Sequence, residues 1–205
     1  MAKRRSYTAV ERQRTVEAGR ERIIQAAREL LEDEEAEGFS IDAVARRAGV
    51  ARMTVYNQFE SKAGLLEALF DSLAQHGALA GMAEIFKVPD TLEALDQYVA
   101  IFGRFWTTNR RAHRRLRAAA LHDDELAAAI DSRNDRRRRG VAEIVRRLGD
   151  SARPVVSRDD VVNVVFVLLS FDTFDALAGP DRTPDDVVPI ARQLIRGVLG
   201  LPAVQ

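Results

Sequence analysis

The 205-residue chain is predicted to be an all-α protein. Alanine, leucine, arginine and glutamate recur throughout it, and these residues favour helix. Apolar residues recur at helical spacing in nearly every segment, and no alternating strand pattern of useful length is present. Short helices with polar tips occupy residues 1–75, and long helices with wide apolar faces follow in residues 76–205. We therefore expect two domains.

Composition limits the classes of function. The sequence has no cysteine, so disulfides and thiolate metal sites are excluded. It has no apolar run long enough to span a bilayer, and its basic start lacks the hydrophobic core of a secretory signal. We expect a cytoplasmic protein without a membrane partner. The formal net charge is +0, so overall charge does not argue for nucleic acid, although basic residues flank one motif in the first domain.

Caps and breaks place the helices of the first domain. Apolar residues at helical spacing predict the first helix, which Gly38 ends. Ser40 is a good N-cap for a short second helix, Gly49 separates it from a third, and Ser61 caps a fourth. The predicted helices are 15–35, 41–48, 51–58 and one that begins at 62.

Longer helices are expected in the second domain, after a linker at 87–91. The run 161–169, "VVNVVFVLL", could form a buried strand on composition alone, but its Asp-Asp start, its length and its helical neighbours favour helix. Asp123 is a plausible cap, and the last segment begins with a cap and a first-turn proline. The predicted helices are 91–109, 110–122, 123–149, 157–179 and 183–201.

The stretch "GVARMTVYNQF", residues 49–59, fits the second half of a helix-turn-helix. Gly49 can take a positive φ, and small Ala45 lets two helices approach. When Val50, Val55 and Phe59 point inward, a polar set is left on the exposed side. Arginine can bind guanine, asparagine and glutamine can bind adenine, and threonine and methionine can contact the thymine methyl group. The exposed set is Arg52, Met53, Thr54, Tyr56, Asn57 and Gln58.

Residues 38–70 resemble the N-terminal domain of the TetR (tetracycline-repressor) family of bacterial regulators. The resemblance rests on Phe39, Val44-Ala45, Ala48-Gly49-Val50, Thr54-Val55-Tyr56, Phe59, Ser61-Lys62 and Leu65-Leu66. It implies about nine helices, of which three form a DNA-binding head and the rest a ligand-binding body. Segment 168–202 resembles the last two helices of many members, which implies a homodimer through 157–179 and 183–201.

The same resemblance assigns roles in binding a double-stranded operator. Tyr56 and Lys62 would contact phosphates, with Ser40 near a phosphate. Arg52 and its two neighbours would face bases. At position 58 the family more often has histidine or tyrosine, so the contact of Gln58 is in doubt. The expected DNA-binding set is Ser40, Ala51, Arg52, Met53, Thr54, Tyr56, Asn57, Gln58 and Lys62.

An effector site is expected in the second domain. Aromatic side chains on the helix 91–109 could be core alone or line an apolar pocket, and the resemblance favours the pocket. Asn134 and Ser170 interrupt apolar helices with neutral polar groups that could orient a ligand. The expected set is Phe102, Phe105, Trp106, Asn134, Phe166 and Ser170.

Alternative interpretations remain beside these. The basic N-terminal tail is either a frayed end or a DNA-contacting arm. Arg110–Arg117 and Asp135–Gly140 are interpreted as solvated or ion-paired faces rather than nucleic-acid patches. His122–Glu125 reads better as a helix start than as a metal site. We expect no catalytic residue, metal or cofactor. The helix-turn-helix and the resemblance imply a transcriptional regulator, most simply a repressor released by a small, largely apolar effector. A constitutive DNA-binding protein and a helical enzyme or carrier are the alternatives.

Overall fold

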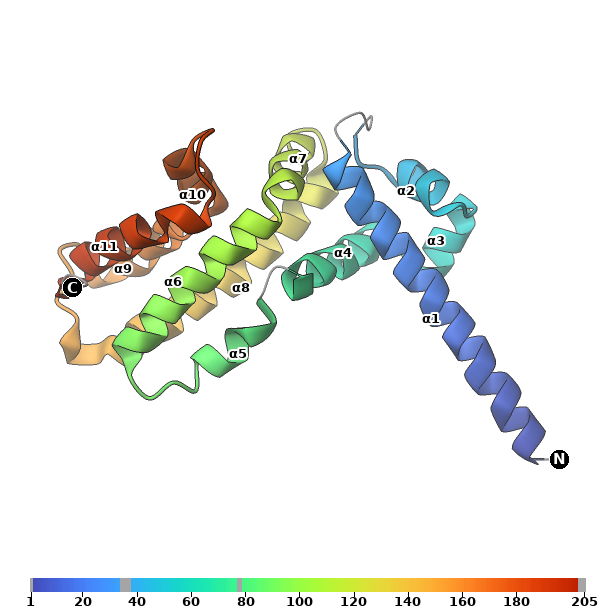
Figure 1. Cartoon of the computed structure of the whole chain (residues 1–205), viewed down its shortest axis with the longest axis horizontal. Helices are drawn as coiled ribbons and strands as arrows, with labels where there is room; N and C mark the ends of the chain where they lie inside the picture. The colour runs from blue at the N-terminus through green and yellow to red at the C-terminus, as the bar shows by residue number, and fades with distance from the viewer. Residues whose placement is uncertain (1, 34–37, 77–78, 203–205) are drawn as a thin grey trace. The chain divides into compact units, whose positions relative to one another are not determined.

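The computed structural model describes residues 2–33, 38–76 and 79–202, and within them every regular element is a helix. The all-α prediction is confirmed, and the alternative of a strand at 161–169 is wrong, because most of that run lies in a helix. Figure 1 shows the elements in chain order. Their bounds are α1 Ala2–Glu32, α2 Ile41–Ala48, α3 Arg52–Phe59, α4 Lys62–His76, α5 Met82–Ile85, α6 Thr91–Thr108, α7 Arg110–Ala120, α8 Asp124–Leu148, α9 Arg158–Leu168, α10 Phe171–Ala178 and α11 Val188–Leu199, with short 3-10 turns at Leu79–Gly81, Gly149–Ser151 and Asp185–Val187.

The chain divides into two compact units. Unit 1 comprises Met1–Ser72 and Arg114–Ala129, and unit 2 comprises Leu73–His113 and Ile130–Gln205. Helices α7 and α8 each contribute residues to both units. The predicted DNA-binding and effector-binding domains, 1–75 and 76–205, stay a prediction.

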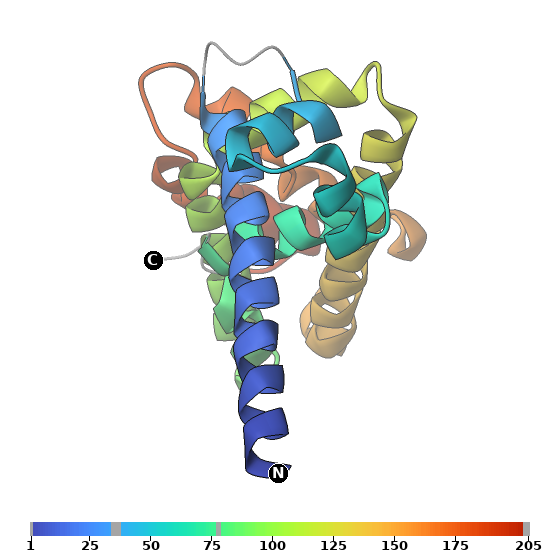
Figure 2. The same ribbon diagram turned by 90° about the vertical axis from the view of Figure 1, so that its right-hand side faces the viewer.

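In unit 1, α1 packs against α2, and α2 packs against α3. Ile23 and Ala27 of α1 are fully buried, as are Val44 of α2 and Val55 of α3. Figure 2 shows α2 and α3 beside the C-terminal half of the α1 ribbon. Helix α1 begins at Ala2, whereas the prediction had it begin near Thr15. The residues before Thr15 contain no glycine or proline to interrupt a helix. The prediction missed them because they show no apolar residues at helical spacing.

The turn between α2 and α3 requires glycine. Gly49 has φ 66° and ψ 36°, the left-handed conformation that costs glycine least. Its amide donates to the carbonyl of Arg46 at 3.2 Å, and the amide of Val50 donates to that of Ala45 at 3.0 Å. This pair of bonds is a Schellman C-cap, which satisfies carbonyls that the end of α2 would otherwise leave without partners. The turn sets the direction in which α3 begins.

In unit 2, α6 carries the core of the body. The carboxylate of Asp90 caps its start by accepting from the amide of Leu92 at 2.8 Å. One face of α6 meets α11, where Arg196 donates from Nε and Nη2 to the two carboxylate oxygens of Asp96 at 3.2 and 2.6 Å. Arg196 is only 8% exposed, so this bidentate pair fastens the last helix to the body.

The predicted helix 157–179 is wrong in one respect, because the structure divides it into α9 and α10. The break falls at Leu169 and Ser170, and the Ser170 hydroxyl caps α10 by accepting from the amide of Thr173 at 3.2 Å. The two helices differ in direction by 46°. Among the described residues no single helix is long and apolar enough to cross a membrane, although this bent pair together meets the same length and composition criteria.

Candidate nucleic-acid interface

Helix α3 has an outward face whose side chains are exposed to solvent and do not belong to the core. Arg52, Met53 and Asn57 are exposed, with Met53 66% exposed, while Val55 and Phe59 are buried against the rest of unit 1. Thr54, Tyr56 and Gln58 are half-buried. The predicted division into an inward and an outward face is therefore present. An eight-residue helix is roughly 12 Å long, comparable with the width of a major groove.

Arg52 lies at the N-terminal end of this face and has two partners within unit 1. Its Nη1 donates to the carboxylate of Asp42 at 2.9 Å, and its Nη2 donates to the Tyr56 hydroxyl at 3.3 Å. These side chains are exposed: 57% for Arg52 and 50% for Asp42. The hydrogen bond to Tyr56, and then the Asp42 charge, raise the pKa of Arg52 above its ordinary value. An exposed ion pair of this kind is weak and can exchange for another partner.

The C-terminal end of α3 is fixed to α1. Arg20 donates from Nη1 to the carbonyl of Gln58 at 2.8 Å, and its guanidinium lies 4.2 Å from the ring centroid of Phe59. The bond uses the main chain of Gln58 and leaves the amide side chain for other contacts. Arg20 therefore holds α3 in place without occupying its outward face.

A tight corner joins α3 to α4. Glu60 has φ 65°, an uncommon value for a residue with a side chain. The Ser61 hydroxyl caps α4 by accepting from the amide of Gly64 at 3.0 Å. Gly64 is needed because a Cβ there would lie 2.1 Å from the carbonyl oxygen of Phe59. This geometry places Lys62 in the first turn of α4, directly after α3.

Lys62 is ion-paired in the structure. Its Nζ donates to the carboxylate of Asp123 and lies 3.7 Å from an oxygen of Glu125, both within unit 1. Burial alone raises the pKa of Asp123, but hydrogen bonds from Lys62 and from the amide of Leu126, together with the Lys62 charge, bring that pKa below its ordinary value. Sequence analysis missed this pairing because the partners are 61 positions apart and no local pattern links them.

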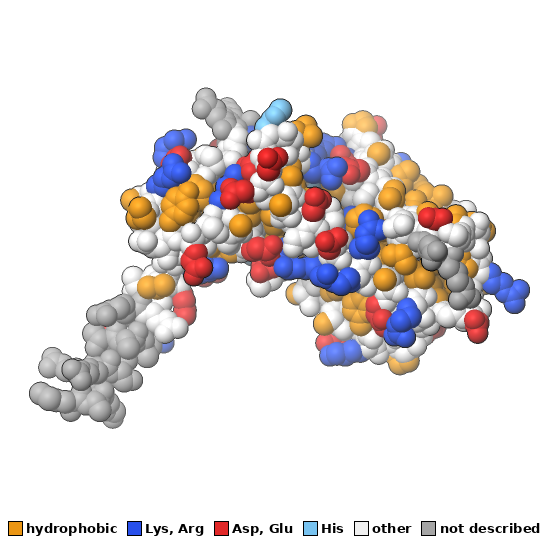
Figure 3. Space-filling view, turned by 180° about the vertical axis from the view of Figure 1, so that it is seen from behind, with side chains coloured by type: hydrophobic (Ala, Val, Ile, Leu, Met, Phe, Trp, Pro, Cys, Tyr) orange, Lys and Arg blue, Asp and Glu red, His pale blue; other side chains and the backbone are white. Residues whose placement is uncertain are grey.

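Ser40 and Ala51 complete the predicted DNA-binding set. The Ser40 hydroxyl caps α2 by accepting from the amide of Ala43 at 3.2 Å, which leaves its own proton available to a phosphate. Ala51 is the N-cap position of α3 and makes no side-chain cap bond. The side chains of the basic residues Lys3, Arg4, Arg5 and Arg12 lie outside the described residues. Figure 3 shows basic and acidic side chains close together on the face that it presents.

The aromatic residues expected to hold an effector lie together in unit 2. Phe102 and Trp106 have ring centroids 5.7 Å apart, and Phe105 and Trp106 are 4.7 Å apart. All three are at most 7% exposed. His113 and Phe171 extend the group, with centroids 4.7 and 5.7 Å from Trp106. These rings pack directly on one another, and the Trp106 indole donates to the carbonyl of Leu169 at 3.1 Å.

The other three expected effector residues have different surroundings. Phe166 is half-buried, and the guanidinium groups of Arg137 and Arg138 lie 4.3 and 4.1 Å from its ring centroid. Arg137 also lies 5.6 Å from the Trp106 ring, so it connects the two aromatic positions. Ser170 is occupied as the cap of α10, and Asn134 is half-buried on α8. Sequence analysis did not single out Arg137, since it stands in a run of four arginines with no mark to distinguish it.

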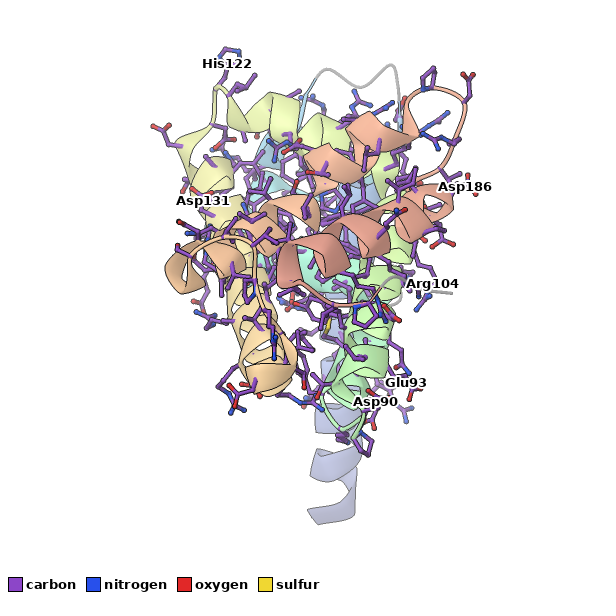
Figure 4. The ribbon with its side chains drawn as sticks, turned by 90° about the vertical axis from the view of Figure 1, so that its left-hand side faces the viewer. Asp90, Glu93, Arg104, His122, Asp131 and Asp186 are labelled. Carbon is purple, nitrogen blue, oxygen red and sulfur yellow. The ribbon has the colours of Figure 1, made fainter. Side chains whose placement is uncertain are left out.

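The acidic segment after α7 starts a helix. Asp123 accepts from the amide of Leu126 at 3.1 Å through Oδ1, which caps α8. His122 projects from the turn between α7 and α8 (Figure 4). Within the described part of the chain, no group of three or more histidine and acidic residues could hold a metal ion.

The chain is similar to known bacterial regulators. Residues 23–69 match the family model described as bacterial regulatory proteins, tetR family. Comparison with curated protein sequences gives no significant match. Among solved structures, a transcriptional regulator from Rhodococcus sp. Rha1 is 18% identical with a TM-score of 0.62, over 88% of this chain and 95% of that one.

Two further structures extend the comparison. PfmR, a TetR-family regulator from Thermus thermophilus, is 20% identical with a TM-score of 0.57, over 87% of this chain and 97% of that one. RolR in complex with the ligand resorcinol is 19% identical with a TM-score of 0.54, over 93% of this chain and 92% of that one. At these identities the structures show a shared fold.

Proposed function

We propose that this chain, whose residues 23–69 match the family model of tetR bacterial regulatory proteins, is a DNA-binding transcriptional regulator. In this proposal it is a cytoplasmic, homodimeric repressor that a small, largely apolar effector releases from a palindromic operator. The observation that carries the proposal is the outward face of α3. Its Arg52, Met53 and Asn57 are exposed and lie outside the core of unit 1, and they match the chemistry of base edges.

Each residue of the DNA-binding set has a role in this proposal. Arg52, Met53 and Thr54, in the first turn of α3, read bases. Tyr56, Lys62 and Ser40 bind phosphates, which fix register without reading sequence. Ala51, Asn57 and Gln58 lie at the edge of the contact. Support comes from the position of this turn, since the N-terminal residues of a recognition helix face the bases.

The dimer interface is proposed on the last helices, which we redefine as α9 and α11 because the predicted helix 157–179 is divided. The two helices contact each other in unit 2. Val167 of α9 is 56% exposed and Leu194 of α11 is 43% exposed, so both of these contacting helices present apolar surface that a second copy could cover. Two-fold pairing of this surface would bury both residues.

Leu194→Glu and Val167→Glu should each turn the dimer into a monomer, because a charge would be buried in a self-complementary apolar interface. Sedimentation at micromolar concentration measures the change. Leu121→Glu is the matched control, since Leu121 is 79% exposed outside these helices. Dimers that persist in both variants would place the interface elsewhere.

The effector is proposed to bind beside the aromatic rings of unit 2, among Phe102, Phe105, Trp106 and Phe166, with Asn134 and Ser170 as polar contacts. RolR, which shares the fold, binds resorcinol, a small aromatic molecule. The rings here are mutually packed, so a ligand must separate them and recover that cost through its own burial, about 25 cal/mol per Å² of apolar area. DNA and effector would then weaken each other's binding by the same factor.

The second candidate is a constitutive DNA-binding regulator without an effector. The direct packing of Trp106 on Phe102, Phe105 and His113 favours it, because these rings fill the space between them. A compound that releases the protein from DNA would decide against it. No enzymatic role is proposed.

The deciding experiment selects bound duplexes from a random pool and then screens compounds that release them. A near-palindromic duplex with half-sites roughly 34–36 Å apart, or a multiple of that, is the expected result. A releasing compound should also change the fluorescence of Trp106, the one tryptophan in the sequence. Failure to enrich any duplex would contradict the proposed function. The opposite result is a releasing compound that leaves the Trp106 emission unchanged and keeps its potency against the Phe102→Ala and Phe166→Ala variants. That result would show that the effector pocket lies elsewhere.

A further inference from the structure

The ammonium group of Lys62 lies between two carboxylates of the turn that begins α8. Asp123 accepts a hydrogen bond from it, and Glu125 is 3.7 Å away. The side chains of Lys62 and Asp123 are only 20% and 18% exposed, so water screens this pair less than it screens the exposed pair of Arg52 with Asp42. The three groups together carry one net negative charge.

The same ammonium is the proposed phosphate contact. Lys62 is the first residue of α4, directly after the corner that ends the recognition helix. A phosphate that approaches Lys62 therefore meets a cation whose charge two carboxylates already balance, and their repulsion opposes its approach. A carboxylate and a phosphate are alternative anionic partners for one lysine.

The carboxylate of Asp123 is held in position by a second hydrogen bond. Its second oxygen, Oδ1, accepts from the amide of Leu126 at 3.1 Å and so caps α8. A movement of the carboxylate away from Lys62 would remove the cap from a 25-residue helix. Lys62 has a flexible four-carbon stem and no such second role, so the exchange of partners must occur by movement of the lysine.

We propose that Asp123, assisted by Glu125, is a built-in competitor for the Lys62 ammonium that lowers the affinity of the head for DNA. DNA binding then exchanges a carboxylate of the chain for a phosphate. This inference rests on the proposed function, in which Lys62 contacts the DNA backbone. Because a phosphate contact carries no sequence information, the competition weakens all duplexes alike.

The test compares Asp123→Asn with Asp124→Asn in the full-length protein. Both changes remove one negative charge, but Asp124 is exposed and makes no contact with Lys62 that we observe, and asparagine can still cap α8 at position 123. A labelled duplex of mixed sequence, about three helical turns long, is titrated with each variant at several salt concentrations. Asp123→Asn should bind on the order of tenfold more tightly and steepen the slope of log affinity against log salt by about one. Asp124→Asn should change neither by more than about twofold.

A second part of the experiment repeats the comparison in the Lys62→Ala variant. In that background Asp123→Asn should have no effect, because the competitor acts only through the lysine. Glu125→Gln should repeat the effect of Asp123→Asn more weakly, since Glu125 is more distant and 60% exposed. Circular dichroism on heating confirms that each variant is folded.

Several results would overturn the inference. Equal gains from Asp123→Asn and Asp124→Asn would reduce it to a general charge effect. Weaker binding by Asp123→Asn would mean that the carboxylate positions Lys62 for the phosphate instead. Unchanged DNA affinity of Lys62→Ala would show that Lys62 does not contact the DNA. It would overturn this inference and leave the proposed DNA-binding function intact. No binding by the parent protein or by any variant would overturn both proposals.

Discussion

Helices α3 and α6 place large side chains in opposite environments. On α3, Met53 is 66% exposed, whereas on α6 Trp106 is 4% exposed and in contact with several rings. The contrast shows which sequence patterns are informative. The exposed arginine, methionine and asparagine of α3 are not explained by core packing, whereas aromatic residues at helical spacing on α6 are explained by packing alone.

The ion pairs of the two units show the same contrast. Arg52 and Asp42 in unit 1 are 57% and 50% exposed, so their bond can exchange for contacts with DNA. Arg196 and Asp96 in unit 2 are 10% and 24% exposed and joined by two hydrogen bonds. The first pair leaves an arginine available, and the second holds a helix in place.

The largest expected effect is on the stability of the body. Trp106→Ala should lower the free energy of unfolding by about 3–5 kcal/mol, because it leaves a cavity among packed rings and an unpaired carbonyl at Leu169. Denaturant titration measures the loss. Met53→Ala is the contrasting change on α3 and should stay within about 0.5 kcal/mol of the parent. A loss below about 1 kcal/mol for Trp106→Ala would show that the aromatic group is loosely packed and would favour a preformed pocket.

Arg52→Ala tests the outward face of α3 through DNA binding rather than through stability. It should cost on the order of 1–3 kcal/mol in binding to the selected duplex while leaving stability nearly unchanged. Titration against selected and scrambled duplexes provides the measurement. A specific loss on the selected duplex assigns Arg52 to a base, whereas an equal loss on both would make it a phosphate contact.

Glu60→Gly should stabilise unit 1 by about 1 kcal/mol, because glycine tolerates the positive φ at this corner at lower cost. Glu60→Ala retains a Cβ and serves as the control, which should show no such gain. The thermal midpoint of unfolding distinguishes the two. Equal midpoints in both variants would mean that the corner relaxes without strain.

The smallest effect concerns acid stability. The folded-state pKa of Asp123 lies below its ordinary value, so its charge stabilises the folded state fully above the unfolded pKa, about 4. That contribution is lost as the pH falls through the folded pKa. Thermal midpoints measured between pH 7 and lower values should therefore converge for the parent and Asp123→Asn as acid is added. If the difference in thermal midpoint between the parent and Asp123→Asn is the same at every pH, the charge of Asp123 does not cause it.

Local signals in the sequence determined much of this protein. Gly49, Ser40 and the spacing of Val55 and Phe59 predict α2, α3 and the outward face of α3, because caps, left-handed turns and helical periodicity depend on residues a few positions apart. The DNA-binding set stays a prediction; apart from Ser40, which caps α2, its members belong to α3 or directly flank it. Ser170 was itself a local signal for the start of α10, but we interpreted it as a ligand contact.

Tertiary structure alone decided which distant groups meet. Lys62 pairs with Asp123 across 61 positions, and Arg137 lies against the rings of both Trp106 and Phe166. The sequence contains many arginines and acidic residues that could have formed these contacts equally well. Which of them do so depends on how helices pack, and the energy of that choice is spread over many buried apolar contacts rather than carried by any short motif.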